Sequence, residues 1–125
     1  MASRLSVLLV TDDPHLREIA EYGFPEDVDV TMVVDSHDAL TAMRERIPNV
    51  VVVDLQTGSA GGFNLLMEMH EDSLTRAVPT LLLLERSQDE WLAKQAGAAA
   101  IRVKPLGTSE FVAETLSAAK SAKST

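Results

Sequence analysis

The chain alternates between short runs rich in apolar and β-branched residues and longer stretches in which apolar residues recur every three or four positions. The short runs, residues 5–10, 28–34, 50–53, 80–84 and 101–103, predict β-strands. The consecutive valines at 50–53 are typical of a strand that is buried on both faces, as in the middle of a parallel sheet. The longer stretches between the runs predict helices, so the pattern indicates an α/β fold.

Residues that commonly start or stop helices lie between the predicted strands. The expected signals are Asp13 with Pro14, Ser36, Ser87 with Glu90, and Ser109 at helix starts, and Gly23, Pro48 and Gly97 at helix ends. The residues expected to face the core are Leu16, Ile19, Ala20, Leu40, Met43, Ile47, Phe63, Leu66, Met67, Leu92, Ala96, Val112, Leu116 and Ala119.

Five strand–helix units follow one another along the chain. Right-handed crossovers between such units produce a doubly wound parallel sheet with helices on both faces. With 125 residues, the chain is expected to form one domain, 1–125, in which 117–125 are a frayed helix end or the start of a linker.

Composition narrows the classes of function. The net charge is −8 and Lys and Arg do not cluster, so direct binding to nucleic acid is not expected. The absence of cysteine excludes disulfides and thiolate metal sites within the chain. The apolar runs are far shorter than the ~18 residues that a membrane helix needs. We therefore expect a cytoplasmic protein that makes no membrane contact.

Charged residues directly follow three of the predicted strands. Asp54 comes after the valine run, Asp12 and Asp13 come after the first strand, and Lys104 comes after the fifth. Because the carboxyl ends of parallel strands meet at one edge of a sheet, carboxylates and an ammonium group should converge there. This combination is suited to binding phosphate and a divalent metal.

With this order, the segments "LLVTDDPHLRE", "VVVVDLQTGSAGGF", "VPTLLLL" and "AGAAAIRVKPL" make the chain resemble the receiver domain of bacterial response regulators. The resemblance covers nearly the whole chain. It implies a flavodoxin-like five-stranded parallel sheet in the order 2-1-3-4-5. It also implies a two-component phosphorelay, in which a histidine kinase or a phosphotransfer protein donates a phosphoryl group to an aspartate with the help of Mg²⁺.

The same resemblance assigns roles to individual residues. Asp54 matches the phosphoacceptor, and Lys104 matches the lysine that pairs with a phosphoryl oxygen. Asp12, Asp54 and the main-chain carbonyl of Gln56 match the metal ligands, whereas Asp13 is expected to be a helix cap. The Lys104–Pro105 peptide bond is expected to be cis.

Several positions depart from the family pattern. Thr11 stands where an outer acid is usual, so Mg²⁺ binding should be weak. Leu84 replaces a hydroxyl residue and Glu85 a small one, so phosphorylation should be slow. Ile101 replaces the aromatic that moves on activation, so the usual switch cannot operate as it does in relatives.

Two functions therefore stay open. The first is a phosphoaccepting signalling module, and the second is a pseudo-receiver that acts as a protein-interaction domain without phosphorylation. An enzyme is not expected, because the first strand lacks a phosphate-cradling glycine loop and no nucleophile elbow is present. The implied downstream partner is a protein bound by the face formed by the fourth helix, fifth strand and fifth helix. Trp91, on the fourth helix, either covers the edge of the core or contacts a partner protein.

Overall fold

The computed structural model describes residues 5–55 and 61–121. Strands and helices alternate along it, as the sequence pattern predicts. The strands are β1 (Leu5–Val10), β2 (Val28–Val33), β3 (Val50–Asp54), β4 (Thr80–Leu84) and β5 (Ala100–Val103). The helices are α1 (Pro14–Gly23), α2 (Ser36–Glu45), α3 (Gly61–Glu71), α4 (Glu90–Gln95) and α5 (Thr108–Ser121), with a short 3₁₀ turn, η1 (Ser87–Asp89), before α4.

The strands form one parallel sheet in the order β2-β1-β3-β4-β5, which confirms the predicted topology. The register places Val10 opposite Val53, and Asp54 opposite Leu83. Leu84 at the end of β4 is in turn opposite Val103 at the end of β5. The carboxyl ends of these four strands therefore lie side by side, and the segments that follow them share one edge of the sheet.

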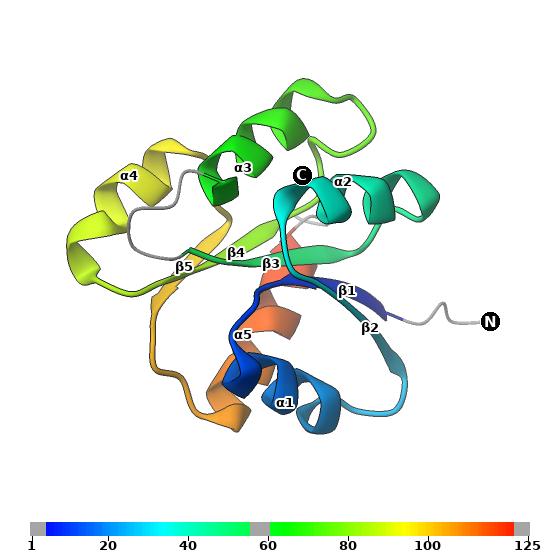
Figure 1. Cartoon of the computed structure of the whole chain (residues 1–125), viewed down its shortest axis with the longest axis vertical. Helices are drawn as coiled ribbons and strands as arrows, with labels where there is room; N and C mark the ends of the chain where they lie inside the picture. The colour runs from blue at the N-terminus through cyan, green and yellow to red at the C-terminus, as the bar shows by residue number, and fades with distance from the viewer. Residues whose placement is uncertain (1–4, 56–60, 122–125) are drawn as a thin grey trace.

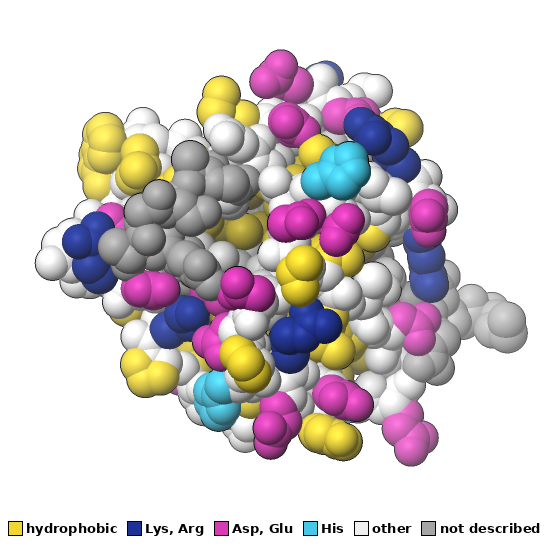
Figure 2. Space-filling model, in the orientation of Figure 1, with side chains coloured by type: hydrophobic (Ala, Val, Ile, Leu, Met, Phe, Trp, Pro, Cys, Tyr) yellow, Lys and Arg dark blue, Asp and Glu magenta, His cyan; other side chains and the backbone are white. Residues whose placement is uncertain are grey.

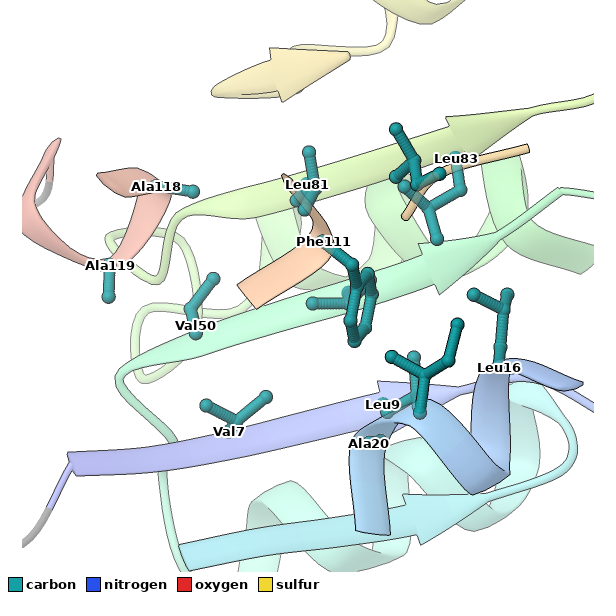
Figure 3. Packing of buried hydrophobic residues seen from close by; sticks show 13 residues of the cluster. Val7, Leu9, Leu16, Ala20, Val50, Leu81, Leu83, Phe111, Ala118 and Ala119 are labelled. Atoms are coloured by element: carbon teal, nitrogen blue, oxygen red, sulfur yellow. The ribbon is translucent and has the colours of Figure 1, made fainter. Parts of the chain in front are cut away.

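Helices cover both faces of the sheet (Figure 1). Helices α1 and α5 lie together on one face, where Phe111 of α5 packs over the inner strands (Figure 3). Helices α2, α3 and α4 lie on the other face. Successive residues of β1, β3 and β4 point to opposite faces, so Val7 and Leu9 belong to the first cluster and Leu8 and Val10 to the second. This double burial explains the unbroken apolar runs in the sequence.

The helix faces differ in part from those expected. Leu65, Leu66 and Met69 of α3 are buried, whereas Met67 is 58% exposed. Met67 lies about 200° around the helix from both Leu65 and Met69, so it points away from the sheet that buries them. The run 63–69 is apolar on more than one side, and only packing selects the side that is buried.

Helix α2 starts and ends differently from the prediction. Its N-cap is Asp35, whose side chain accepts a hydrogen bond from the main-chain N–H of Asp38, so Ser36 is the first helical residue. Ile47 lies beyond the last residue, Glu45, and is 42% exposed rather than inward-facing. The expectation for α1 is confirmed, because Asp13 caps it and Pro14 is its first residue.

The capping box predicted at Ser87 does not form. Ser87 lies in η1, and neither η1 nor α4 has a side-chain cap. A 3₁₀ turn has three residues per turn rather than 3.6, so it rotates the residues that follow. As a result Ala93 faces the core, while Leu92 is 49% exposed.

Helix α5 is rotated by one residue relative to the predicted stripe. Its buried residues are Phe111, Thr115, Ala118 and Ala119, whereas Val112 and Leu116 are only partly buried. Thr115 is tolerated inside because its hydroxyl donates a hydrogen bond to the Phe111 carbonyl, at 2.8 Å. The helix continues to Ser121, and residues 122–125 of the expected frayed end or linker lie outside the described residues.

Candidate functional site

Asp54 is the last residue of β3, and its side chain is almost completely buried, with 1% of it exposed. Strands β1 and β4 flank β3, so the carboxylate emerges between the segments that follow those strands. A carboxylate at this depth must be paired or hydrogen-bonded to remain charged. The surrounding residues supply both kinds of contact.

Lys104 follows β5 and provides the opposite charge. Its Nζ atom lies 2.7 Å from Oδ1 of Asp54 and 3.5 Å from Oδ2 of Asp13, and 17% of its side chain is exposed. The Lys104–Pro105 peptide bond is cis, which confirms the prediction. The ammonium therefore lies between two carboxylates that come from different strands.

Thr11, directly after β1, also contacts Asp54. Its hydroxyl donates a hydrogen bond to Oδ2 of Asp54 at 2.6 Å and accepts one from the main-chain N–H of Asp13 at 3.0 Å. Arg17 of α1 holds the same segment, since its Nη1 donates to the main-chain oxygen of Thr11. Thr11 itself is 3% exposed, so the contact is shielded from water.

The two oxygens of Asp54 consequently have different surroundings. Oδ2 has a well-formed hydrogen bond from Thr11. Oδ1 forms an ion pair with the Lys104 ammonium. Among the described residues, however, Oδ1 is the one buried side-chain polar atom that has no aligned hydrogen-bond donor. Oδ1 is thus the oxygen with capacity for a further partner.

Burial of the Lys104 ammonium disfavours its charged form. The contact with Asp54 and the nearby carboxylate of Asp13 act in the opposite direction and outweigh it. The net effect is that the pKa of Lys104 is raised above its ordinary value. Lys104 therefore stays fully charged at neutral pH and neutralises Asp54.

Beside Asp54 lies a hollow that is lined by two further acids. It is lined in part by Thr11, Asp12, Asp35, Ser36 and Asp54. Asp12 is exposed at its mouth, whereas Asp54 lies at its base. Within residues 5–55 and 61–121, no group of three or more acidic or histidine side chains could together hold a metal.

The residues fit a weakly held divalent cation. Mg²⁺ uses one or two carboxylates and keeps several waters, and Asp12 and Asp54 are two carboxylates that line one hollow. Oδ1 of Asp54 also has unused acceptor capacity. The third expected ligand, the carbonyl of Gln56, lies outside the described residues.

The departures from the family pattern have definite locations. Leu84 is 1% exposed and belongs to the apolar cluster against which the partly buried Ile101 packs. Glu85 is exposed and, with Asp13, His15 and Lys104, lines a second hollow next to the site. No hydroxyl therefore extends from the end of β4, and Glu85 adds an acidic residue to the hollow that Lys104 also lines.

Sequence reasoning missed two contacts at this site. It treated Thr11 only as the loss of an acid, although the residue is a hydrogen-bond donor to Asp54. It treated Asp13 only as a cap, although Oδ1 caps α1 while Oδ2 faces Lys104. The available signal was the placement of both residues directly after β1, which is adjacent to β3.

The rest of the surface agrees with the composition. On the face drawn in Figure 2, acidic side chains are spread throughout and Lys and Arg are scattered among them rather than gathered. The three histidines, His15, His37 and His70, are exposed. None of the helices within the described residues has the length and apolar character needed to cross a membrane.

Comparison with known proteins places these features in a family. The model of the response regulator receiver domain matches residues 7–115. The DNA-binding response regulator MtrA of Mycolicibacterium smegmatis is 32% identical over 113 residues, which cover 88% of this chain and 48% of that protein. The chain thus spans about half the length of this curated relative.

Solved structures agree on the fold. A response regulator structure from Chloroflexus aurantiacus superposes with a TM-score of 0.82 at 21% identity, covering 92% of this chain and 97% of that one. The Mn²⁺-bound form of response regulator Rcp1 has a TM-score of 0.69 at 14% identity, covering 93% and 92%. With the family match over most of its length, the chain belongs to the response regulator receiver domain family.

Proposed function

We propose that this receiver domain accepts a phosphoryl group on Asp54 from the phosphohistidine of a histidine kinase or phosphotransfer protein. The observation that carries the proposal is the contact between Asp54 and Lys104, 2.7 Å apart at the carboxyl edge of the sheet. Phosphoryl transfer depends mostly on positioning and charge neutralisation, and this pair supplies both.

In the transfer, an oxygen of Asp54 forms a bond to phosphorus as the bond from phosphorus to the histidine nitrogen breaks. The electron pair of that bond goes to the imidazole. Lys104 then pairs with a phosphoryl oxygen, as its flexible stem allows. Asp13 keeps the ammonium close to the site when the Asp54 carboxylate becomes an acyl phosphate and no longer carries its own charge.

Mg²⁺ binding by Asp12, Asp54 and the carbonyl of Gln56 is part of the proposal. When bound, the cation would neutralise charge on the transferring phosphoryl group. Receiver domains generally bind Mg²⁺, but here Thr11 supplies no charge to the site. We therefore propose that Mg²⁺ binds weakly. Lys104 then neutralises a larger share of the charge on the phosphoryl group than it would in a site that holds Mg²⁺ tightly.

A pseudo-receiver remains the second candidate, and specific residues favour it. Leu84 offers no hydroxyl to a phosphoryl oxygen, and Glu85 would repel an approaching phosphoryl donor. In this alternative the domain is a protein-interaction module that needs no phosphorylation. Switching of either kind requires contacts that differ between two states of the domain.

The proposed setting is a two-component pathway in the cytoplasm. The domain acts as a signalling module rather than as an enzyme with an external substrate. We propose that the face made by α4, β5 and α5 binds a downstream protein, because Trp91 of α4 is 70% exposed and Leu92 49%. Direct contact of this chain with nucleic acid is not proposed, since its net charge is −8.

Amide NMR spectra before and after addition of beryllofluoride with Mg²⁺ test the two candidates. A phosphoacceptor should show shifts near Asp54 and in residues 56–61, and Asp54→Asn should show none. Because Leu84 cannot bond to the phosphoryl analogue, α4 and Ile101 should change little. The absence of any shift in the parent protein would support the pseudo-receiver instead.

A further inference from the structure

Thr11 is held in place at every polar atom. Its main-chain N–H donates to the Val33 carbonyl at 3.0 Å, and its carbonyl accepts from Arg17. Its hydroxyl has one hydrogen, which is directed at Oδ2 of Asp54, and the hydroxyl oxygen accepts from the N–H of Asp13. With 3% of the residue exposed, water does not compete for these bonds.

This arrangement makes the two carboxylate oxygens of Asp54 chemically different. A hydrogen bond to Oδ2 at 2.6 Å draws electron density from that oxygen and occupies one of its two lone-pair directions, which makes Oδ2 a poorer ligand for a cation. Oδ1 faces a mobile ammonium and has no aligned donor. It can therefore form a new bond once Lys104 moves to the incoming group.

A neutral hydroxyl also changes what the site needs from a metal. A carboxylate at the position of Thr11 would repel Asp54 at this distance and would need a cation between the two groups. The threonine hydroxyl attracts Asp54 instead, so Asp54 is oriented without a cation. A divalent ion that binds to Oδ2 must therefore compete with this hydrogen bond.

We propose that Thr11 is a positioning residue that selects Oδ1 of Asp54 as the acceptor oxygen and weakens the binding of divalent cations to Oδ2. The selection of the acceptor oxygen rests on the proposed function, whereas the effect on cations does not. In the transfer, Oδ1 forms the bond to phosphorus. The bond from phosphorus to the donor breaks, its electron pair leaves with the donor, and Oδ2 keeps the Thr11 hydrogen bond.

Two substitutions isolate the hydroxyl. Thr11→Val preserves the shape of the side chain and removes the donor, whereas Thr11→Ser retains the donor. Thr115→Val is the matched control, because Thr115 is also buried and hydrogen-bonded but lies in α5 rather than beside Asp54. Folding of each variant is checked by its amide spectrum, in which the N–H of Asp13 should move only in Thr11→Val and Thr11→Ser.

The first measurement is Mn²⁺ binding, followed by the paramagnetic broadening of amide signals around the site. Thr11→Val should bind Mn²⁺ severalfold more tightly than the parent, whereas Thr11→Ser and Thr115→Val should bind as the parent does. Equal affinities for the parent and Thr11→Val would overturn the effect on cations. The effect on cations would also be overturned if Thr11→Ser bound Mn²⁺ as tightly as Thr11→Val and more tightly than the parent.

The second measurement is the rate of phosphorylation by acetyl phosphate, read by intact mass, at several Mg²⁺ concentrations. Thr11→Val should lose about tenfold or more in rate at low Mg²⁺, because a hydrogen bond to a charged group is lost, and should recover as Mg²⁺ rises. Thr11→Ser should retain the parent profile. A parallel fall at all Mg²⁺ concentrations would contradict selection by Thr11.

The two measurements separate the failure of this inference from that of the proposed function. If the parent is not phosphorylated at any Mg²⁺ concentration, the proposed phosphoacceptor function fails. The Mn²⁺ measurement then still decides whether Thr11 weakens cation binding to Oδ2. If the parent is phosphorylated and Thr11→Val behaves identically in both measurements, the function stands and the inference about Thr11 fails.

Discussion

The Nζ atom of Lys104 lies 2.7 Å from Oδ1 of Asp54, and this ion pair joins the end of β5 to the end of β3 across β4. Asp54 is almost completely buried and Lys104 is largely so. Neither charge has enough water to remain stable alone. The pair is therefore both a feature of the candidate site and a contribution to the stability of this edge of the sheet.

Removal of the ammonium should destabilise the domain in a pH-dependent way. Because the pKa of Lys104 is raised on folding, its stabilising effect is fully present below the ordinary lysine pKa of 10.5 and is lost as pH rises through the folded-state pKa. At pH 7, Lys104→Met should lower the free energy of unfolding by about 3 kcal/mol. The difference from the parent should shrink only above pH 10.

Urea unfolding at pH 7, 10 and 11.5 measures this dependence, because the last value lies above the unfolded-state pKa. Lys94→Met is the matched control, because Lys94 is an exposed lysine of α4. A constant difference between Lys104→Met and the parent across this range would contradict the assigned ion pair.

An acid at position 11 should make stability depend on Mg²⁺. Thr11→Asp removes the donor to Oδ2 and adds a buried charge beside Asp54, so without divalent cations the variant should unfold at a lower temperature than the parent. Millimolar Mg²⁺ should raise its Tm more than that of the parent, since binding to the folded state stabilises it. Thermal unfolding with and without Mg²⁺ measures both effects. Equal Mg²⁺ responses would show that position 11 is not next to the cation.

A hydroxyl at the end of β4 should extend the response to phosphoryl analogues. Leu84→Thr should cost about 2–4 kcal/mol in stability, because Leu84 is buried and its replacement is smaller and polar. If the domain is a phosphoacceptor, the new hydroxyl should bring β4 into the set of amides that shift with beryllofluoride. Leu82→Thr is the control, because Leu82 points to the same face of β4 two residues before Leu84. This variant should be destabilised, but its β4 amides should not shift with beryllofluoride.

Trp91 reports on α4 without any substitution, because it is the sole tryptophan and is 70% exposed. Acrylamide should quench its fluorescence efficiently. Beryllofluoride with Mg²⁺ should leave both its emission maximum and its quenching unchanged, since no hydroxyl links Asp54 to β4 and α4. A clear change in quenching in the parent, absent from Asp54→Asn, would indicate that a switch reaches α4 by another route.

Gly97 should tolerate a side chain poorly. Its φ of +88° is in the region that favours glycine, and a Cβ there would clash with Nε2 of His70. Gly97→Ser should cost about 1–2 kcal/mol. The same change at Gly107, where a Cβ meets nothing within 4 Å, should be neutral or slightly stabilising because serine is a good N-cap for α5. Urea unfolding of the two variants compares them, and equal costs would contradict the backbone argument.

Several features follow from the sequence alone, because they depend on neighbours in the chain. The valine run before Asp54 marks a strand with both faces buried, and Pro14 after Asp13 marks a helix start. The repeated order of strand and helix restricts the topology, since right-handed crossovers leave few ways to build a parallel sheet. That order also places Asp54 and Lys104 at the same edge.

Tertiary structure alone decided the side of each helix that is buried and the partners of Asp54. Met67 and Leu66 are both apolar, and only the position of α3 over the sheet selects Leu66 for the core. The hydrogen bond from Thr11 to Oδ2 depends on the register that places Val10 opposite Val53. Contacts between side chains far apart in sequence require ångström-scale placement by packed strands, which the local pattern of apolar and polar residues does not encode.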